Sequence, residues 1–210
     1  EDANAHMVGT AMSVIGRSFK QRLIEHAEEQ LGKSQIPYCF LALGSMGRDE
    51  QLLVTDQDNA IILDDTYDEA KHGKYFEALS KFICDGLDQC GYVYCTGDIM
   101  ATNPTWRMTR REWEECFADW IDNPNPKALL NASIFFDLDG VYGRLKWAEQ
   151  LNGFIVRRVR RNNRFLACLA RNALNRTPPL GFFKDFVMEK DGRHNNSINL
   201  KRRGTAPLQI

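Results

Sequence analysis

Residues 38–63 constrain the fold of this chain more than any other stretch of its sequence. They contain two short apolar runs, YCFLAL and DNAIIL, with the connection GSMGRDEQLLVTDQ between them. Pro37 and Gly44 bound the first run, and both runs have the length of a buried strand rather than of a helix. Asp56 and Asp58 stand where the connection meets the second run. The stretch therefore predicts two buried strands, joined by a glycine-rich turn that leads into a pair of carboxylates.

Helices are predicted on both sides of these strands. Apolar side chains recur at helical spacing over residues 7–31 and again over residues 76–90, and a glycine follows each pattern. A third strand is expected in YVYCTGDIM, residues 92–100. The order helix, strand, strand, helix, strand predicts an α/β or α+β fold built on a small mixed sheet.

The second half of the sequence favours helices. Residues 127–138 and 143–176 have helical patterns. The aromatic residues that precede them are spaced like the buried side of a helix and are expected in a core: Trp106, Trp113, Phe117 and Trp120. We therefore expect two domains, an α/β domain over residues 1–122 and an all-α helical bundle over residues 123–210.

Composition is that of an ordinary globular protein. Of the 210 residues, 43% are hydrophobic and 26% are charged. No apolar run approaches the roughly 18 residues that cross a bilayer, and the six cysteines form no CxxC pair. We therefore expect a cytoplasmic protein with reduced thiols and no membrane partner. Because the sequence begins EDANAH, without methionine, we also expect it to be a piece of a longer chain.

Charge is distributed unevenly along the chain. Residues 1–100 contain 8 Lys and Arg against 17 Asp and Glu, whereas residues 101–210 contain 19 against 11. An acidic half can hold cations and a basic half can hold anions, or the two halves simply attract each other. The overall pI of about 6.5 argues against a dedicated nucleic-acid-binding protein.

The aspartate pair and the glycine-rich turn together suggest a phosphate site. Carboxylates two residues apart on a strand share a face, with Cα atoms roughly 6–7 Å apart. Such a pair can hold divalent cations for phosphoryl or nucleotidyl displacement. In the turn, Gly44 and Gly47 let phosphate oxygens approach backbone N–H groups. Ser45 adds a hydroxyl and Arg48 a fork-shaped cation. The alternative is an ordinary turn beside a solvated strand edge.

LGSMGRDEQLLVTDQDNAIIL, residues 43–63, resembles the core motif of the DNA polymerase β-like nucleotidyltransferase superfamily. The finer pattern, GSMGR-x-E with TDQDNA, is similar to that of signal-transduction nucleotidyltransferases found with CBS-pair or cyclic-nucleotide-binding domains. Those proteins are relatives of the uridylyltransferase that modifies the PII protein. Further matches are CTGDIMATNPTWR, SIFFDLDGVYG, and the run from PPLGFF to INLK, which resembles that family's C-terminal helical substrate-binding domain. The resemblance implies a nucleotidyltransferase domain, a helical bundle, and regulatory domains N-terminal to them in a longer chain.

The resemblance also implies roles for individual residues. Asp56 and Asp58 would hold two Mg²⁺ ions, with Mn²⁺ as a substitute, and Asp98 would be the third ligand and the base. The phosphates of ATP or UTP would bind at Gly44, Ser45, Gly47, Arg48 and Thr55. Gln57 departs from the apolar residue that the superfamily prefers between the aspartates, and it is expected to leave this strand face less buried. For Asp98, the alternative is a strand-edge residue in a tight turn.

A second motif suggests a different enzyme class. IFFDLDGVYG, residues 134–143, resembles the first motif of haloacid-dehalogenase-type phosphatases, in which Asp137 would be the nucleophile. That fold needs the motif on its first strand and an acidic pair far downstream. Only 67 residues follow, they are basic and helical in pattern, and they contain no GDxxxD. We therefore rank the phosphatase well below the nucleotidyltransferase.

These observations predict a metal-dependent nucleotidyltransferase that acts in signalling. It would move a nucleoside monophosphate from ATP or UTP to a hydroxyl of a protein or small molecule and release pyrophosphate. Arg161, Arg164 and Lys201 belong to basic clusters that could contact a phosphate or an acidic substrate, or could simply face solvent. The alternative function, from another class, is a non-catalytic nucleotide-sensing module of a regulatory protein.

Overall fold

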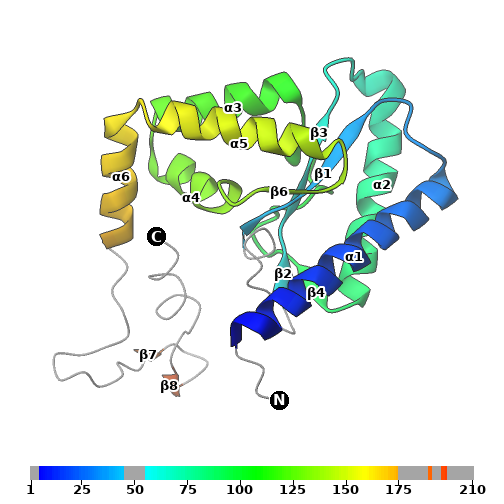
Figure 1. Ribbon diagram of the computed structural model, residues 1–210, viewed down its shortest axis with the longest axis horizontal. Helices are drawn as coiled ribbons and strands as arrows, with labels where there is room; N and C mark the ends of the chain where they lie inside the picture. The colour runs from blue at the N-terminus through cyan, green and yellow to red at the C-terminus, as the bar shows by residue number, and fades with distance from the viewer. Residues whose placement is uncertain (1–4, 45–54, 175–188, 191–194, 198–210) are drawn as a thin grey trace. The chain divides into compact units, whose positions relative to one another are not determined.

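The two apolar runs form adjacent strands in the computed structural model, which describes residues 5–44, 55–174, 189–190 and 195–197 (Figure 1). They are β1 (Tyr38–Ala42) and β3 (Asn59–Leu63), which pair antiparallel with Phe40 opposite Ile61. Every residue of both strands is buried. Strands covered on both faces need apolar side chains at successive positions, which explains the unbroken runs.

Two further strands complete this sheet. β5 (Arg107–Thr109) lies parallel to β3, and β6 (Asp139–Gly143) lies antiparallel to β1. The strand order is β5-β3-β1-β6. The combination of parallel and antiparallel pairs, with helices packed around them, confirms the predicted α+β fold with a small mixed sheet.

A second, two-stranded sheet carries the first aspartate. β2 (Thr55–Gln57) pairs parallel with β4 (Tyr92–Tyr94), and Asp56 lies opposite Val93. β4 ends at Tyr94, so the strand expected over residues 92–100 is shorter than predicted. It ends there because the chain closes a turn in which the Asp98 N–H donates to the Cys95 carbonyl at 3.0 Å.

One face of the main sheet is covered by α1 (Ala5–Leu31) and α2 (Glu69–Gln89) (Figure 1). Both helices match the predicted periodic segments, and α1 is followed by Gly32 in the left-handed conformation, φ +84°. The two helices contact each other as well as the sheet. The core beneath them is a cluster of buried residues that includes Ile24, Phe40, Ile61, Phe76, Leu79, Ile83 and Val141.

The other face is covered by α3 (Arg110–Asp122), α4 (Pro126–Phe135) and α5 (Leu145–Val159) (Figure 1). A short 3₁₀ helix, η2 (Pro104–Trp106), precedes β5. The indole N–H of Trp113 donates to the Ile61 carbonyl at 3.0 Å, which ties α3 to β3. As predicted, the aromatic series is core, and its buried members pack on one another and on Phe135: Trp106, Trp113, Phe117 and Trp120.

The position of β6 differs from the expectation that the chain after residue 122 is helical. β6 is a central part of the fold, because it pairs with β1 and contacts both α1 and α5. The first compact unit therefore runs to Arg160, and the second comprises Arg161–Ile210, whereas the boundary expected from the sequence lay at 122/123. Glycine is depleted in strands, and the two glycines of DGVYG leave this segment without a strand pattern.

The described part of the second unit begins with α6 (Asn163–Leu174). The sequence predicted one helix over residues 143–176, but α5 ends at Val159 and the Asn162 side chain starts a new helix by accepting from the Phe165 N–H at 2.9 Å. β7 (Glu189–Lys190) and β8 (Asn195–Ser197) form a short antiparallel pair, so the described part of this unit is not entirely helical. Across the described residues, none of the helices combines the length and apolarity of a membrane span.

Candidate functional site

The two predicted metal-binding aspartates lie where β2 leads into β3. Burial alternates along this segment: Asp56 and Asp58 are half-buried, whereas Gln57 and Asn59 are each 0% exposed. Because successive side chains of an extended chain point to opposite faces, the two carboxylates share the more open face and the two amides face the interior. This is the arrangement expected from their spacing.

Asp58 is held against the end of β1. Its carbonyl accepts from the Leu43 N–H at 3.0 Å. The next residue, Gly44, is buried and has φ +57°, and a Cβ built on it would lie 3.3 Å from Oδ2 of Asp58. The left-handed backbone favours glycine here, and a side chain at this position would also press on the Asp58 carboxylate. The first glycine of the predicted phosphate-binding motif thus lies beside the second aspartate.

The buried amides behind the aspartates are hydrogen-bonded to each other and to the backbone. Gln57 Nε2 donates to the carbonyls of Cys84 and Tyr92 at 2.9 and 3.0 Å. Gln57 Oε1 accepts from Asn59 Nδ2 at 3.1 Å. The expectation that Gln57 leaves the strand less buried is therefore wrong, because α2 and β4 supply backbone acceptors that let a glutamine be buried at low cost. These partners are 27 and 35 residues away in sequence, and no local pattern announces them.

Asp98 lies in the turn that follows β4, exposed and with φ +56°. A tight turn was the alternative to its predicted role as third metal ligand and base, and that role stays a prediction. Aspartate is among the few residues that tolerate this conformation. Its carboxylate accepts from Asn103 Nδ2 at 2.9 Å, and its carbonyl accepts from the Trp106 indole at 2.9 Å. One residue further, the Ile99 carbonyl accepts from the Asn59 N–H at 3.0 Å. The Asp98 turn is thereby attached to the start of β3, next to Asp58.

Cys95 connects the same turn to the second aspartate. Burial raises the pKa of its thiol, and a hydrogen bond to the Asp58 carboxylate raises that pKa further. The thiol therefore remains protonated at neutral pH and donates to Asp58. Sequence reasoning had not singled out Cys95, since its only signal is a position three residues before Asp98.

Comparison with known families gives two matches along the chain. Residues 1–127 match the family described as Putative nucleotidyltransferase DUF294, and residues 163–210 match the Putative nucleotidyltransferase substrate binding domain DUF294_C. The chain belongs to the DUF294 nucleotidyltransferase family. No curated protein matches its sequence. The first match contains the aspartate pair, Gly44 and the Asp98 turn, so the site lies within the nucleotidyltransferase part of the chain.

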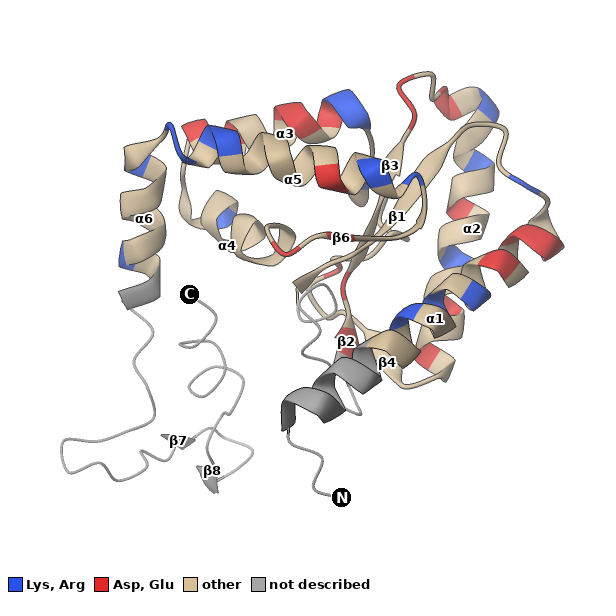
Figure 2. Ribbon diagram, in the orientation of Figure 1, with Lys and Arg blue, Asp and Glu red and all other residues tan. Residues whose placement is uncertain are grey.

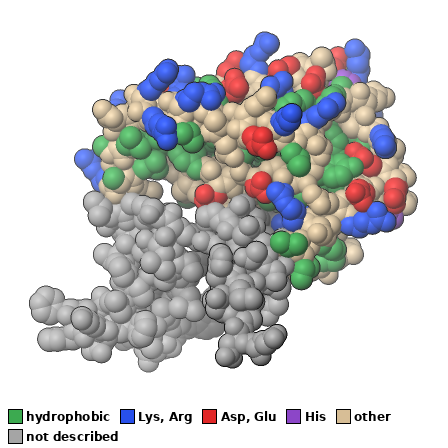
Figure 3. Space-filling view, viewed as in Figure 1, with side chains coloured by type: hydrophobic (Ala, Val, Ile, Leu, Met, Phe, Trp, Pro, Cys, Tyr) green, Lys and Arg blue, Asp and Glu red, His purple; other side chains and the backbone are tan. Residues whose placement is uncertain are grey.

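Several predicted DUF294 site residues fall outside the described structure. Ser45, Gly47, Arg48 and Lys201 are among them, and Thr55 is described only as the first residue of β2. Arg161 and Arg164 belong to the second unit and are exposed. Figure 2 shows basic residues at the end of α5 and on α6. In Figure 3, cationic and anionic side chains are interspersed over α3 and α5.

The donor atoms at this site suit a hard divalent cation. Among the described residues, no group of three or more His, Cys, Asp or Glu side chains is placed to hold a metal ion. Mg²⁺, however, is commonly bound through one or two carboxylates together with substrate phosphates rather than by an all-protein cage. Asp56 and Asp58, on the open face of their strand, fit this two-carboxylate mode.

The phosphatase motif has a different structural role. Ile134 and Phe135 are the last residues of α4, so Asp137 follows a helix rather than the strand that a phosphatase nucleophile requires. Asp139 begins β6, and its carboxylate accepts from Arg17 on α1 at 2.6 Å. The segment therefore connects α4 to β6, and the ion pair between Asp139 and Arg17 attaches α1 to that strand.

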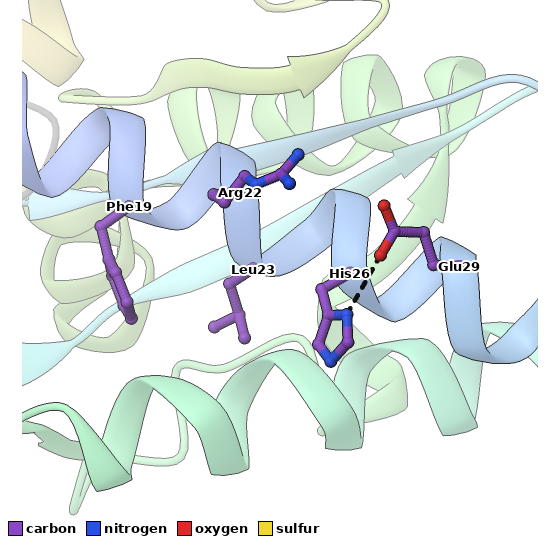
Figure 4. Close-up of a pocket in the computed structure, with 5 residues that line it drawn as sticks. All are labelled: Phe19, Arg22, Leu23, His26 and Glu29. Carbon is purple, nitrogen blue, oxygen red and sulfur yellow. Dashed lines mark hydrogen bonds and ion pairs between the residues drawn. The ribbon is translucent and has the colours of Figure 1, made fainter.

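A surface groove on α1 does not coincide with the aspartate site. It is lined by Phe19, Arg22, Leu23, His26 and Glu29 (Figure 4). Leu23 and His26 point toward α2, where Leu23 lies close to Gly86 and His26 packs edge-on against Phe82. The groove is the edge of the contact between α1 and α2, and none of the residues that line it belongs to the aspartate site.

Proposed function

We propose that this chain is a Mg²⁺-dependent nucleotidyltransferase that transfers a nucleoside monophosphate from ATP or UTP to a hydroxyl of a protein or small molecule in signalling. The observation that carries the proposal is the pair of half-buried carboxylates, Asp56 and Asp58, on one face of the chain, with Gly44 beside Asp58, in a chain of this family. Mn²⁺ could replace Mg²⁺ at the same oxygen ligands.

In this proposal, Asp56 and Asp58 hold the metal ions, and the turn that starts at Gly44 holds the β- and γ-phosphates. Ser45, Gly47, Arg48 and Thr55 are the proposed phosphate contacts, from their positions in the motif. When bound, Mg²⁺ neutralises phosphate charge and aligns the α-phosphate for in-line displacement.

Asp98 is proposed to act on the acceptor. The acceptor oxygen forms a bond to the α-phosphorus as the bond to the bridging oxygen of pyrophosphate breaks. The acceptor's proton passes to the Asp98 carboxylate, which is exposed and is held by Asn103. A carboxylate fixed in this way need not be reoriented before it accepts the proton.

The second unit is proposed to recognise the acceptor. Its match to a nucleotidyltransferase substrate binding domain supports this role. Arg161, Arg164 and Lys201 would contact a phosphate or acidic groups of the acceptor. The proposed signalling role and the relation to PII uridylyltransferase rest on the GSMGR and TDQDNA motifs, and regulatory domains would adjoin this chain in a longer protein.

A second candidate is a nucleotide-sensing module that binds without reacting. It is favoured by the lack, among the described residues, of any three-residue group able to hold a metal. The two functions differ in Asp98, because sensing needs the phosphate turn but no base. Asp98→Asn should leave nucleotide binding intact in either case and should abolish transfer only in an enzyme.

The proposal is tested with Asp56→Asn and Asp58→Asn. We expect each variant to lose Mg²⁺-dependent binding of ATP or UTP, measured by calorimetry. We also expect transfer of α-phosphate label from these nucleotides, measured with a cell extract as acceptor source, to fall ~10³-fold or more. Removing one of two neighbouring like charges should leave the melting temperature without metal unchanged or raised.

Glu77→Gln is the matched control for this test. Glu77 is exposed on α2, and its replacement removes one carboxylate charge without touching the aspartate face. It should bind nucleotide and transfer label like the wild type. Normal Mg²⁺-dependent binding and transfer in both aspartate variants would contradict the proposed site.

A further inference from the structure

We infer that Asn59 is a positioning residue, whose buried amide holds the Asp98 turn in register with Asp56 and Asp58. The inference rests on the proposed function and adds to it a residue with no contact to nucleotide, metal or acceptor. What points to it is one side chain that joins two segments 42 residues apart in sequence, one carrying the aspartate pair and the other carrying Asp98.

Hydrogen bonds join the buried Asn59 amide to three other segments of the chain. Its Oδ1 accepts from the Ala101 N–H at 2.7 Å and from the Cys84 thiol at 3.5 Å. Its Nδ2 donates to Gln57 Oε1 at 3.1 Å. The side chain is 0% exposed, so no water competes for these groups. Asn59 therefore contacts the aspartate strand, α2 and the segment after Asp98 at once.

The Asn59 side chain lies on the interior side of the segment that carries the two aspartates. Asn59 follows Asp58 directly, and its side chain points away from the open carboxylate face, into the interior. Gln57, between the two aspartates, is fixed to α2 and β4 by its own two hydrogen bonds. The backbone that carries both carboxylates is thus anchored from behind at alternate residues, and Asn59 is the anchor that reaches the Asp98 segment.

The segment that Asn59 holds, from Asp98 to Arg107, is cross-linked by its own hydrogen bonds. Ala101 is fully buried, and its carbonyl accepts from Arg107 Nη1 at 2.7 Å. The same guanidinium nitrogen donates to the Thr102 carbonyl at 3.1 Å. At the N-terminal end of the segment, Asp98 accepts hydrogen bonds from the side chains of Asn103 and Trp106. Because the segment is internally cross-linked, fixing Ala101 fixes the position of the Asp98 carboxylate as well.

The pairing of the strands does not use this amide, because the β3 backbone itself pairs with β1 and β5. Replacing the amide by an apolar side chain would leave the Ala101 N–H and Gln57 Oε1 without these partners, at a cost in stability. A buried amide instead gives a directional contact, which an apolar side chain cannot provide. The outer partners of metal-binding residues commonly act in this way, and their loss lowers metal affinity or activity by roughly 10–100-fold.

The test compares Asn59→Leu with Cys84→Ala. Both alter the same buried site, but only Asn59→Leu removes the acceptor for the Ala101 N–H. For Asn59→Leu we expect a kcat for label transfer from ATP or UTP that is reduced about 10–100-fold, with KM changed less than about threefold. We also expect faster hydrogen–deuterium exchange at the Ala101 amide. Cys84→Ala should keep a near wild-type kcat and a protected Ala101 amide.

A second variant covers the case in which Asn59→Leu does not fold. Arg107→Met releases the same segment from its other side and leaves the aspartate strand untouched, so it should lower kcat in the same direction. Wild-type protein without Mg²⁺-dependent transfer would overturn the proposed function and this inference together. Active wild type with an unchanged kcat or a protected Ala101 amide in Asn59→Leu would overturn the inference alone. Loss of kcat in Cys84→Ala equal to that in Asn59→Leu would also overturn it.

Discussion

At the scale of single residues, the site depends on positions where the backbone allows little choice. Gly44 is buried, has φ +57° and lies beneath the Asp58 carboxylate. Gly32 has a similar backbone, with φ +84°, but a Cβ built there would meet nothing within 4 Å. Comparing alanine substitutions at Gly44 and Gly32 therefore separates the free-energy cost of the left-handed backbone from the cost of crowding the Asp58 carboxylate.

We expect Gly44→Ala to lower both stability and nucleotide binding. The left-handed backbone alone costs a β-carbon about 1–2 kcal/mol, and the neighbouring carboxylate must also shift. The free energy of unfolding, measured with urea, should fall by that amount or more, and Mg²⁺-dependent binding of ATP or UTP should weaken at least tenfold. Gly32→Ala should lose only the backbone cost of about 1–2 kcal/mol and leave binding unchanged. Equal binding by the two variants would show that Asp58 tolerates displacement.

At this scale, the sequence predicts which residues share a face but not what lies behind them. The two-residue period of a strand is local, so it predicted that Asp56 and Asp58 point the same way. The burial of Gln57 depends on acceptors from α2 and β4, which no pattern near residue 57 reveals. Asp98 was expected on a strand. Its tight turn depends instead on a hydrogen bond to the Cys95 carbonyl and on contacts with Asn103 and Trp106, which no sequence pattern reveals.

At the scale of secondary-structure elements, β6 is the strand that most changes the expected plan. It carries Asp139, which Arg17 of α1 holds, and it ends at Gly143 with φ +85°. A Cβ on Gly143 would collide with the Tyr38 carbonyl of β1. The end of β6 therefore packs directly on the backbone of its neighbour, and this close contact requires glycine.

Gly143→Ala should be more destabilising than a substitution that strains the backbone alone. It combines a left-handed backbone with a clash against main-chain atoms that cannot rotate away. We expect a loss of roughly 2–4 kcal/mol, seen as a lower urea midpoint for unfolding followed by tryptophan fluorescence. Gly97→Ala is a suitable control, because the nearest atom to its Cβ would be 3.6 Å away. A loss below about 1 kcal/mol would mean that β6 can shift along β1.

The long helices and the two buried strands β1 and β3 were predictable, whereas β5 and β6 were not. α1 and α2 have 27 and 21 residues, so several turns of the helical period can be seen in each. β5 and β6 have only 3 and 5 residues, and β6 contains two glycines. These two strands form because β3 and β1 offer unpaired edges, which is a tertiary cause that local patterns do not contain.

At the scale of the whole molecule, the core contains thiols that resist ionisation. Burial raises the pKa of Cys39 to about 12, and the nearby charge of Asp139 adds to the effect. Burial likewise raises the pKa of Cys84 to about 12. In the unfolded chain both thiols lose their protons near pH 9, so above that pH the folded state binds more protons than the unfolded state. Stability must therefore fall as pH rises.

We expect the free energy of unfolding to decrease from about pH 9 upward, on the order of 1 kcal/mol per pH unit for each buried thiol. Urea unfolding between pH 7 and pH 10.5 measures this slope. Cys84→Ala removes one of the buried thiols that titrate in this range, so its stability should depend less steeply on pH than that of the wild type. Identical slopes for the two proteins would show that the Cys84 thiol ionises as readily in the folded chain as in the unfolded chain.

The extent of the first folding unit follows from pairings between distant parts of the chain. Phe40 on β1 lies opposite Tyr142 on β6, and α5 contacts both of these strands as well as α3. A sequence pattern can mark the domain that begins the chain but cannot show that a strand about 100 residues later completes its sheet. The expected boundary at 122/123 and the end of the family match at residue 127 both precede β6.

A fragment of residues 1–160 should therefore fold by itself, whereas a fragment of residues 1–127 should not. The shorter fragment lacks β6 and α5, which leaves one edge of β1 unpaired and the Cys39 side of the sheet uncovered. An exposed apolar strand edge favours aggregation. All four tryptophans precede residue 160, so their fluorescence reports on this unit. We expect a single cooperative urea transition for residues 1–160 with a midpoint close to that of the same unit in the full chain. A cooperative transition of equal midpoint for residues 1–127 would show that β6 is an addition to the sheet rather than part of its core.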